Sequence, residues 1–310
     1  MEFYHYSVMQ QQCIEALRVR PDGIYVDMTL GGGGHSLLIA QKLTSGRLIG
    51  IDRDADAIAA AKKRLACFGE RVIFVKDNYK NIRAILQRLG IEQVDGILCD
   101  MGVSSYQLDE AERGFSYHQD APLDMRMDRD MPLTAETVVN TYSAEQLGDI
   151  IFRYGEERYA RKIAAKIVSA RSKAPIHTTA QLSDIIKSAF PPAQRFGDKH
   201  PAKRTFQAIR IEVNDELKDL DAAFEDAVNA LRPGGRIAVM SFHSLEDRVV
   251  KNTFKRLSQG CICDKSLPVC VCHNKEIIKL INRKPIVAGQ EELRENSRSK
   301  PAKLRIGEKL

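Results

Sequence analysis

The stretch YVDMTLGGGGHSLLIA, residues 25–40, decides how the first third of this chain folds. A short apolar run leads into four consecutive glycines, Gly31 to Gly34, and then into a helix-like run that begins at His35. This order is typical of a strand, a turn and a helix in an α/β sheet. Glycines also let the backbone approach a ligand closely. The glycines therefore mark either a ligand site or only a tight turn.

The same alternation of apolar and helical runs continues to residue 100. The expected strands are residues 23–28, 46–52, 71–77 and 94–100, and the expected helices are residues 35–43, 54–68 and 81–89. Strands that alternate with helices predict a parallel sheet covered on both faces.

The alternation stops from about Ser105 to Pro201, where helix-like runs at 143–171 and 178–190 dominate. We predict a helical insertion domain, residues 105–201, within an α/β domain made of residues 1–104 and 202–310. The α/β pattern resumes with one long helix from about Phe206 to Leu231 and a strand that ends in SFHSLED. Segments 276–281 and 303–309 could close the sheet.

The lengths of the apolar runs, the N-terminal sequence and the placement of the cysteines predict a cytoplasmic protein. No apolar run approaches the roughly 20 residues that cross a bilayer, and the N-terminus lacks the pattern of an export signal. Cys13, Cys67 and Cys99 lie singly in periodic segments that we expect to be buried, as in a reducing compartment. Of the net charge of +6, residues 248–310 contribute +9, from 15 Lys and Arg against 6 Asp and Glu. This basic end suggests a polyanionic partner, or only a solvated surface.

Acidic residues end the expected strands, at Asp27, Asp52, Asp77 and Asp100. No Lys-Ser/Thr follows the glycines, which excludes a P-loop, and the third glycine of a dinucleotide fingerprint is missing. Asp52 lies 21 residues after Gly31, where an acid can accept hydrogen bonds from a ribose. This combination favours S-adenosylmethionine. A nicotinamide oxidoreductase is the alternative with the same fold.

Tyr79, Asp100 and Gln107 lie at or beyond the ends of the third and fourth expected strands. Tyr79 could stack on an adenine or only pack. Asp100 could accept the protons of an amine so that its lone pair faces a methyl donor, or could only cap a helix. Gln107 could hold the cofactor or a base edge.

Motifs along nearly the whole chain resemble one family. DMTLGGGGHS, IDRD, DMGVSSYQLD, APLDMRMD, RTFQAIRIEVNDEL and LRPGGRIAVMSFHSLEDR are similar to the RsmH (MraW) family. The resemblance implies a class I, Rossmann-like methyltransferase with a mostly parallel seven-stranded sheet and a helical insertion after strand four. It implies S-adenosylmethionine-dependent methylation of cytosine N4 in small-subunit 16S ribosomal RNA.

Carried over to this sequence, the cofactor contacts of that family would be Gly33, Gly34, His35, Asp52, Tyr79, Asp100 and Gln107. Gly32 stands where some relatives have arginine, so that arginine's role is not transferred. The expected partner is 16S ribosomal RNA in the assembled small subunit. We expect no membrane, and a monomer or a homodimer.

Candidate catalytic residues are Asp100, Asp124 and His243. Asp124 and Asp128 lie four residues apart, one turn if the segment is helical, and could line the cytosine pocket or pair with Arg126 and Arg129. His243, in SFHSLED, could act as a base or make a structural hydrogen bond.

The cysteine cluster CICDKSLPVCVCH raises a separate hypothesis. Two C-x-C pairs, Cys261 with Cys263 and Cys270 with Cys272, could bind a structural zinc ion, or could be four reduced thiols in a loop.

Basic residues with interleaved tyrosines in the insertion could hold RNA phosphates or form a solvated helix face. They are Arg153, Arg158, Arg161, Lys162, Lys166 and Arg171, with Arg195, Lys199, Lys203 and Arg204 further on.

Two other functions are alternatives to RNA methylation. A non-catalytic RNA-binding protein would leave the strand-end acids without a function. A DNA amino-methyltransferase usually carries D/N-P-P-Y/F after strand four, where this chain has DMGV.

Overall fold

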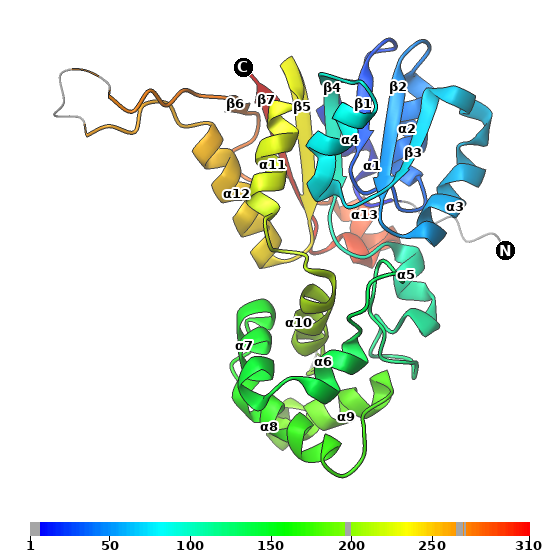
Figure 1. Ribbon diagram of the computed structural model, residues 1–310, viewed down its shortest axis with the longest axis vertical. Helices are drawn as coiled ribbons and strands as arrows, with labels where there is room; N and C mark the ends of the chain where they lie inside the picture. The colour runs from blue at the N-terminus through cyan, green and yellow to red at the C-terminus, as the bar shows by residue number, and fades with distance from the viewer. Residues whose placement is uncertain (1–6, 196–199, 265–268, 270) are drawn as a thin grey trace. The chain divides into compact units, whose positions relative to one another are not determined.

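The computed structural model describes residues 7–195, 200–264, 269 and 271–310 (Figure 1). The chain forms two compact units: Met1–Gly102 together with Asp219–Leu310, and Val103–Lys218. The sequence predicts that the insertion ends at Pro201, but the second unit extends to Lys218. It ends later because the helix Lys203–Asn214 packs with the helices of that unit.

The first unit is built on one seven-stranded sheet in the order β3-β2-β1-β4-β5-β7-β6. Neighbours among β1 to β5 are parallel, and β7 is antiparallel to both β5 and β6. The predicted mostly parallel sheet is therefore confirmed, and both C-terminal segments contribute to it. The strands are β1 (Ile24–Asp27), β2 (Arg47–Asp52), β3 (Val72–Lys76), β4 (Val94–Asp100), β5 (Leu231–Ser241), β6 (Ile278–Leu280) and β7 (Lys303–Lys309).

Helices cover both faces of this sheet (Figure 1). Strand β4 is buried along almost its whole length because a strand with helices on both sides buries both faces. Apolar side chains of α1, α2 and α3 form one core with the strands, and α11 packs against α4 and α12. The helices are α1 (Gln10–Leu17), α2 (Gly34–Lys42), α3 (Ala55–Arg64), α4 (Ile82–Arg88), α11 (Leu220–Asn229), α12 (Ser244–Leu257) and α13 (Gln290–Glu295), with 3₁₀ turns η1 (Ala66–Arg71), η2 (Tyr79–Asn81) and η5 (Ser297–Ser299).

Within its described residues, 103–195 and 200–218, the second unit has helices as its regular elements, joined by loops and one isolated β-bridge between Pro122 and Thr178. Its helices enclose their own apolar core, and α7 and α9 each begin with a capping box. The elements are α5 (Ser105–Asp109), η3 (Ala111–Arg113), α6 (Ala135–Thr141), α7 (Ala144–Gly155), α8 (Ala160–Arg171), α9 (Thr179–Ala189), η4 (Pro192–Gln194) and α10 (Lys203–Asn214).

Two long helices predicted from periodicity are each divided in the structure. The run 206–231 forms α10 and α11, because Asp215 and Asp219 adopt left-handed backbone angles that end one helix and precede the next. The run 143–171 forms α7 and α8, which are separated at Glu156 with a φ of 49°. Periodicity continues across such breaks, so it does not reveal them. Among the described residues, the helices are too short or too polar to span a bilayer.

A loop of the second unit, residues 122–128, is fixed by two buried polar side chains. Arg113 donates to the carbonyl oxygens of Arg126 and Met127 at 2.9 and 3.0 Å. The Asn214 Oδ1 accepts from the Met127 N–H at 2.7 Å, and its Nδ2 donates to the Met125 carbonyl at 2.7 Å. These bonds satisfy backbone groups of Met125, Arg126 and Met127 in a segment that forms neither a strand nor a helix.

Asn214→Ala should therefore destabilise the protein by about 3 kcal/mol, because it leaves buried backbone groups of the loop without partners. Urea unfolding measures this change. The matched control is Asn229→Ala, at an exposed position at the end of α11, for which we expect a change within about 0.5 kcal/mol. Equal stability of the Asn214 variant and the wild type would contradict this role.

Candidate active site

The predicted site residues of the first unit gather at the carboxyl edge of its sheet. Strands β2, β1 and β4 are parallel neighbours, so their last residues, Asp52, Asp27 and Asp100, come to the same edge. Ligands bind beyond this edge in open α/β sheets.

Asp52 holds the glycine loop against β2. One carboxylate oxygen accepts from the Gly31 N–H at 2.7 Å and the other from the Asp54 N–H at 2.9 Å. Burial raises the pKa of Asp52, and these hydrogen bonds partly offset the rise. Each oxygen keeps a second lone pair, which a hydroxyl of a ribose could use.

Gly33 and Gly34 form the start of α2 and leave no room for side chains. Gly33 has a φ of 77°, and a Cβ there would lie 3.3 Å from Ala61 and Leu65. A Cβ at Gly34 would overlap the Ser7 hydroxyl. The helix has no side-chain cap, so the N–H groups of its first turn can serve a carboxylate.

Asp27 is the most deeply buried of the three acids, with 1% of its surface exposed. It accepts hydrogen bonds from the Ser36 hydroxyl at 2.7 Å and from the Thr29 N–H at 3.2 Å. Burial raises the pKa of Asp27 to about 6, although both hydrogen bonds act in the opposite direction. The sequence predicted Asp27 as a candidate contact residue at a strand end, without a specific role.

Asp100 is the acid with the most unusual surroundings. Burial, and then the negative charges of Asp27 and Glu246, raise its pKa well above the usual range. Its Oδ1 is buried and has no hydrogen-bond partner within the described part of the chain. Its backbone N–H donates to the Thr29 hydroxyl at 2.6 Å, which fixes the end of β4. A buried carboxyl oxygen without a partner suits a ligand with N–H donors or positive charge.

His35 lies between Val8 and Asp100 as a neutral side chain. Burial lowers its pKa to about 4. The neutral ring therefore donates one N–H, and its Nε2 lies 3.0 Å from the Val8 carbonyl oxygen, which can only accept. The other nitrogen, Nδ1, then carries a lone pair 3.6 Å from Asp100 Oδ2. His35 thus helps to position the loop and is not a source of protons at neutral pH.

The other predicted cofactor residues fall in different places. Tyr79 begins η2 just beyond β3, on the same edge of the sheet, and its stacking role stays a prediction. Gln107 is in the second unit, where its side chain accepts from the Ser104 N–H at 3.0 Å in a capping box. Sequence reasoning omitted Thr29, whose only signal is a hydroxyl two residues beyond a strand end.

The two other predicted catalytic residues have structural partners. In the second unit, Asp124 makes a two-point ion pair with Arg126, at 2.9 and 2.8 Å. Burial raises the pKa of Asp124, but Arg126 outweighs that effect and holds it below its usual value. The segment with Asp128 is a loop, not a helical turn. In the first unit, His243 Nδ1 caps α12 by accepting from the Glu246 N–H at 3.3 Å.

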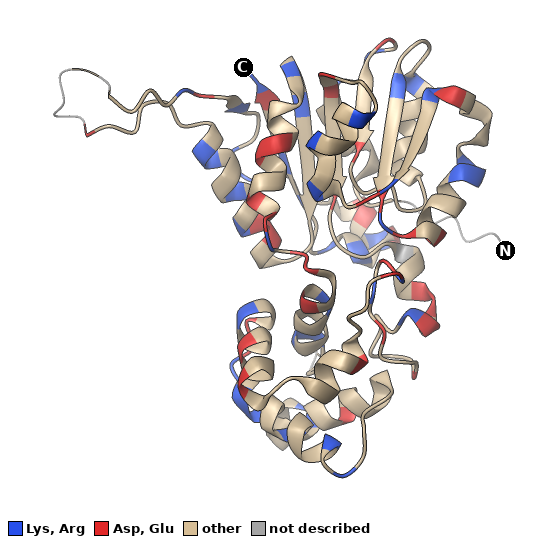
Figure 2. Ribbon diagram, viewed as in Figure 1, with Lys and Arg blue, Asp and Glu red and all other residues tan. Residues whose placement is uncertain are grey.

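The predicted basic residues of the insertion divide into two groups. Arg171 donates to the Val139 and Tyr142 carbonyls at 2.7 and 2.6 Å, so it joins helices. Figure 2 shows Lys and Arg along α8, and α7 carries one arginine in its last turn. The exposed basic residues include Arg153, Arg161, Lys162 and Lys166. Lys199 lies outside the described residues.

Part of the basic C-terminal end is likewise neutralised internally. Arg305 and Lys303 bind Asp247 at 2.7 and 3.2 Å. Arg236, on β5, pairs with Glu308 at 2.8 Å.

A cavity of about 400 Å³ lies elsewhere in the first unit. Its lining includes Ile24, Arg47 and Gln93, at the amino ends of strands, and contains none of the predicted site residues. The carboxyl edge is identified by its polar groups.

The fold and the polar groups at the carboxyl edge identify the class of protein. A sheet in the order 3-2-1-4-5-7-6, with an antiparallel β7, acidic strand ends and a glycine turn before the first crossover helix, is the class I methyltransferase arrangement.

The chain belongs to the MraW methylase family, whose model matches residues 2–310. It is 57% identical over 311 residues to ribosomal RNA small subunit methyltransferase H 2 of Agathobacter rectalis, covering 100% of this chain and 99% of that protein. It is 52% identical to ribosomal RNA small subunit methyltransferase H of Finegoldia magna, over 100% of both chains. A solved structure of an rRNA methylase from Streptococcus thermophilus is 12% identical, with a TM-score of 0.41 and coverage of 97% and 93%.

Gly33→Ala should destabilise the protein by about 1 to 2 kcal/mol, because the methyl group must adopt a left-handed conformation and crowd α3. Gly32→Ala is the matched control, since a Cβ there meets only Arg64 at 3.9 Å, and should change stability by less than about 0.5 kcal/mol. Urea unfolding of both variants decides this. Equal effects at the two glycines would show that the loop is not held as described.

Asp27→Asn tests the protonation of the buried acid. The carboxyl has a pKa of about 6 when folded and about 4 when unfolded. Its contribution to stability is therefore fully present below about pH 4 and is lost as the pH rises to about 6, a change of about 3 kcal/mol. Asparagine does not titrate. The stability of the variant relative to wild type should thus increase by about 2 kcal/mol from pH 4 to pH 7.

His35→Gln is the control for that experiment, because its stability relative to wild type should depend on pH in the opposite direction. The pKa of His35 is lowered to about 4, so its contribution is present above about pH 6.5 and is lost as the pH falls. The stability of this variant relative to wild type should decrease between pH 4 and pH 7. Urea unfolding at both pH values measures each difference, and two pH-independent differences would refute the assignment.

Proposed function

We propose that this protein transfers a methyl group from S-adenosylmethionine to the exocyclic N4 of one cytidine in small-subunit ribosomal RNA. The resemblance to the RsmH (MraW) family implies that this cytidine is cytosine-1402 of the 16S RNA. The family and the names of the relatives from Agathobacter rectalis and Finegoldia magna support an RNA methyltransferase. The observation that carries the chemistry is Asp100, whose buried Oδ1 has no partner among the described residues.

The residues of the carboxyl edge fit this cofactor. S-adenosylmethionine supplies a methyl group on a positively charged sulfur, and it also carries an ammonium, a carboxylate and a ribose. Asp27 and Asp100 form a buried acidic group that favours positive charge. The uncapped start of α2 suits the carboxylate, and Asp52 suits the ribose hydroxyls.

Asp100 would position the base. Its unpartnered oxygen would accept an N–H of the cytosine amine, which directs the nitrogen lone pair away from the carboxyl group. As the N–C bond forms and the S–C bond breaks, the nitrogen must lose one proton. A carboxyl with a raised pKa can accept that proton and release it to water. The base has to leave its stack to reach this position.

The second unit would supply RNA contacts. Arg153, Arg161, Lys162 and Lys166 are exposed on α7 and α8 and could neutralise phosphates, which would make binding strongly dependent on salt. We also propose that Asp124, Gln107 and His243 contact the cytosine base or the cofactor, as the sequence predicts.

We propose that the enzyme acts in the cytoplasm on ribosomal RNA that is free or assembled in the small subunit.

Asp100→Asn should reduce methyl transfer by at least about 100-fold, because the amide has one acceptor oxygen and cannot take up the proton. Unmodified small subunits, labelled S-adenosylmethionine and mass-spectrometric mapping of nucleosides measure the product. Asp77→Asn is the matched control: Asp77 directly follows the end of β3, but its carboxylate binds Asn81 and Arg88. Asp77→Asn should keep transfer near the wild-type rate.

Two outcomes would contradict the proposal in different ways. Full transfer by Asp100→Asn would remove Asp100 from its role. A wild-type product other than N4-methylcytidine would reject the substrate but leave the cofactor site in place.

A further inference from the structure

Residues 259–264 and 271–276, here called the cysteine arm, lie between the end of α12 and β6 (Figure 1). Not one of these residues is buried. Ile262 and Val271 are 60% and 66% exposed. A segment that buries so little apolar surface gains little from hydrophobic packing and needs another constraint to hold one conformation.

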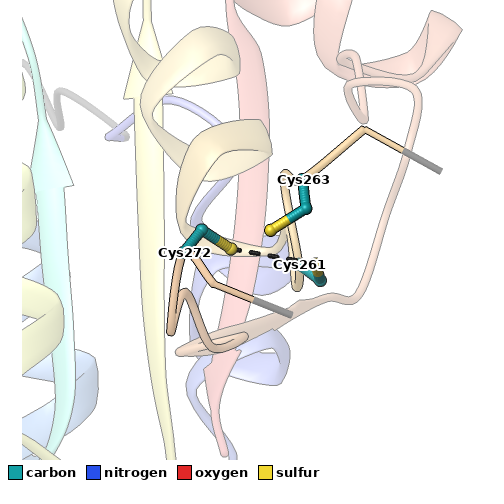
Figure 3. A group of neighbouring side chains, drawn as sticks. All are labelled: Cys261, Cys263 and Cys272. Atoms are coloured by element: carbon teal, nitrogen blue, oxygen red, sulfur yellow. Dashed lines mark hydrogen bonds between the residues drawn. The ribbon is translucent and has the colours of Figure 1, made fainter. Parts of the chain in front are cut away.

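Three sulfur atoms meet within this arm. The Sγ atoms of Cys261, Cys263 and Cys272 lie within 4.8 Å of one another, and Figure 3 shows them converging from the two sides of the arm. Cys270, the fourth predicted ligand, lies outside the described residues.

The spacing of these sulfurs fits a metal better than a disulfide. Cys261 Sγ and Cys272 Sγ are 3.8 Å apart. Two thiolates at 2.3 Å from a tetrahedral zinc ion are about 3.8 Å apart, whereas a disulfide bond is about 2.05 Å long.

Backbone amides support the sulfurs from across the arm. The Val271 N–H donates to Cys263 Sγ at 3.3 Å, and the Ile262 N–H donates to Cys272 Sγ at 3.4 Å. Each side therefore donates to a sulfur of the other side. Donors of this kind stabilise negative charge on sulfur and orient metal ligands. At the base of the arm, Asn274 Nδ2 donates to the Gln259 and Gly260 carbonyls at 2.7 Å.

We propose that Cys261, Cys263 and Cys272 bind one structural Zn²⁺ ion that joins the two sides of the cysteine arm. Thiolates are soft ligands that select zinc over magnesium or calcium. Binding displaces the thiol protons to solvent, and no electron is transferred. The ion takes the place of a hydrophobic core in a segment that has none. This inference is independent of the proposed methyl transfer.

Cobalt is the probe for this site. The full-length chain, reduced and stripped of metal, is titrated with Co²⁺ and then with Zn²⁺. One equivalent of Co²⁺ should give thiolate-to-cobalt charge transfer and the intense visible bands of a tetrahedral site, and Zn²⁺ should abolish both. Affinity should fall as the pH is lowered, because protons compete for the thiolates.

Single serine variants identify the ligands. Cys261→Ser, Cys263→Ser and Cys272→Ser should each weaken binding by at least about 100-fold. Cys67→Ser is the matched control, because Cys67 is exposed and lies outside the arm. It should bind one equivalent with wild-type affinity.

A second readout does not depend on spectra. Zinc should slow proteolysis within the cysteine arm of the wild type at least several-fold, and it should have no such effect in Cys272→Ser. The proposal fails if the wild type shows no tetrahedral cobalt bands at one equivalent, or if the three variants bind like the control. A Cys261–Cys272 disulfide that forms in a reducing glutathione buffer would also overturn it.

Discussion

The desolvation of three aspartates at the ends of neighbouring parallel strands is the constraint on which the site depends. Asp52, Asp27 and Asp100 end β2, β1 and β4, and burial raises the pKa of each. Burying a charged carboxylate costs free energy, and acids with raised pKa values gather at functional sites. The glycine loop, the Ser36 and Thr29 hydroxyls and the neutral His35 are all arranged around them. A cationic ligand would lower the cost of these charges.

The sequence predicted the sheet and its acidic edge well, because both depend on local patterns. Buried parallel strands are continuous apolar runs, and each ends where polar residues begin, as at Asp52 and Asp100. The C-terminal strand at 303–309 was found in the same way. Cys67 was expected to be buried but is exposed in η1, since the periodic run around it ends with α3.

Other features could not be read from the sequence because they depend on distant residues or on single backbone angles. The breaks at Glu156 and Asp215 require left-handed conformations that many residues can adopt at a helix end. The hydrogen bonds of Asn214 to residues 122–128 join segments almost ninety positions apart. The pairing of Asp124 with Arg126 was foreseen as an alternative, whereas the loop geometry that permits it was not.

The central claim is that the acids at the carboxyl edge are built for a positively charged methyl donor. Calorimetry near pH 6, in buffers of different ionisation enthalpy, tests it most directly by comparing S-adenosylmethionine with its uncharged-sulfur product, S-adenosylhomocysteine. The account predicts that the sulfonium compound releases more protons on binding, because it lowers the pKa of Asp27 and Asp100, and that Asp100→Asn reduces this difference. Equal proton release by the two compounds in the wild type would contradict the account.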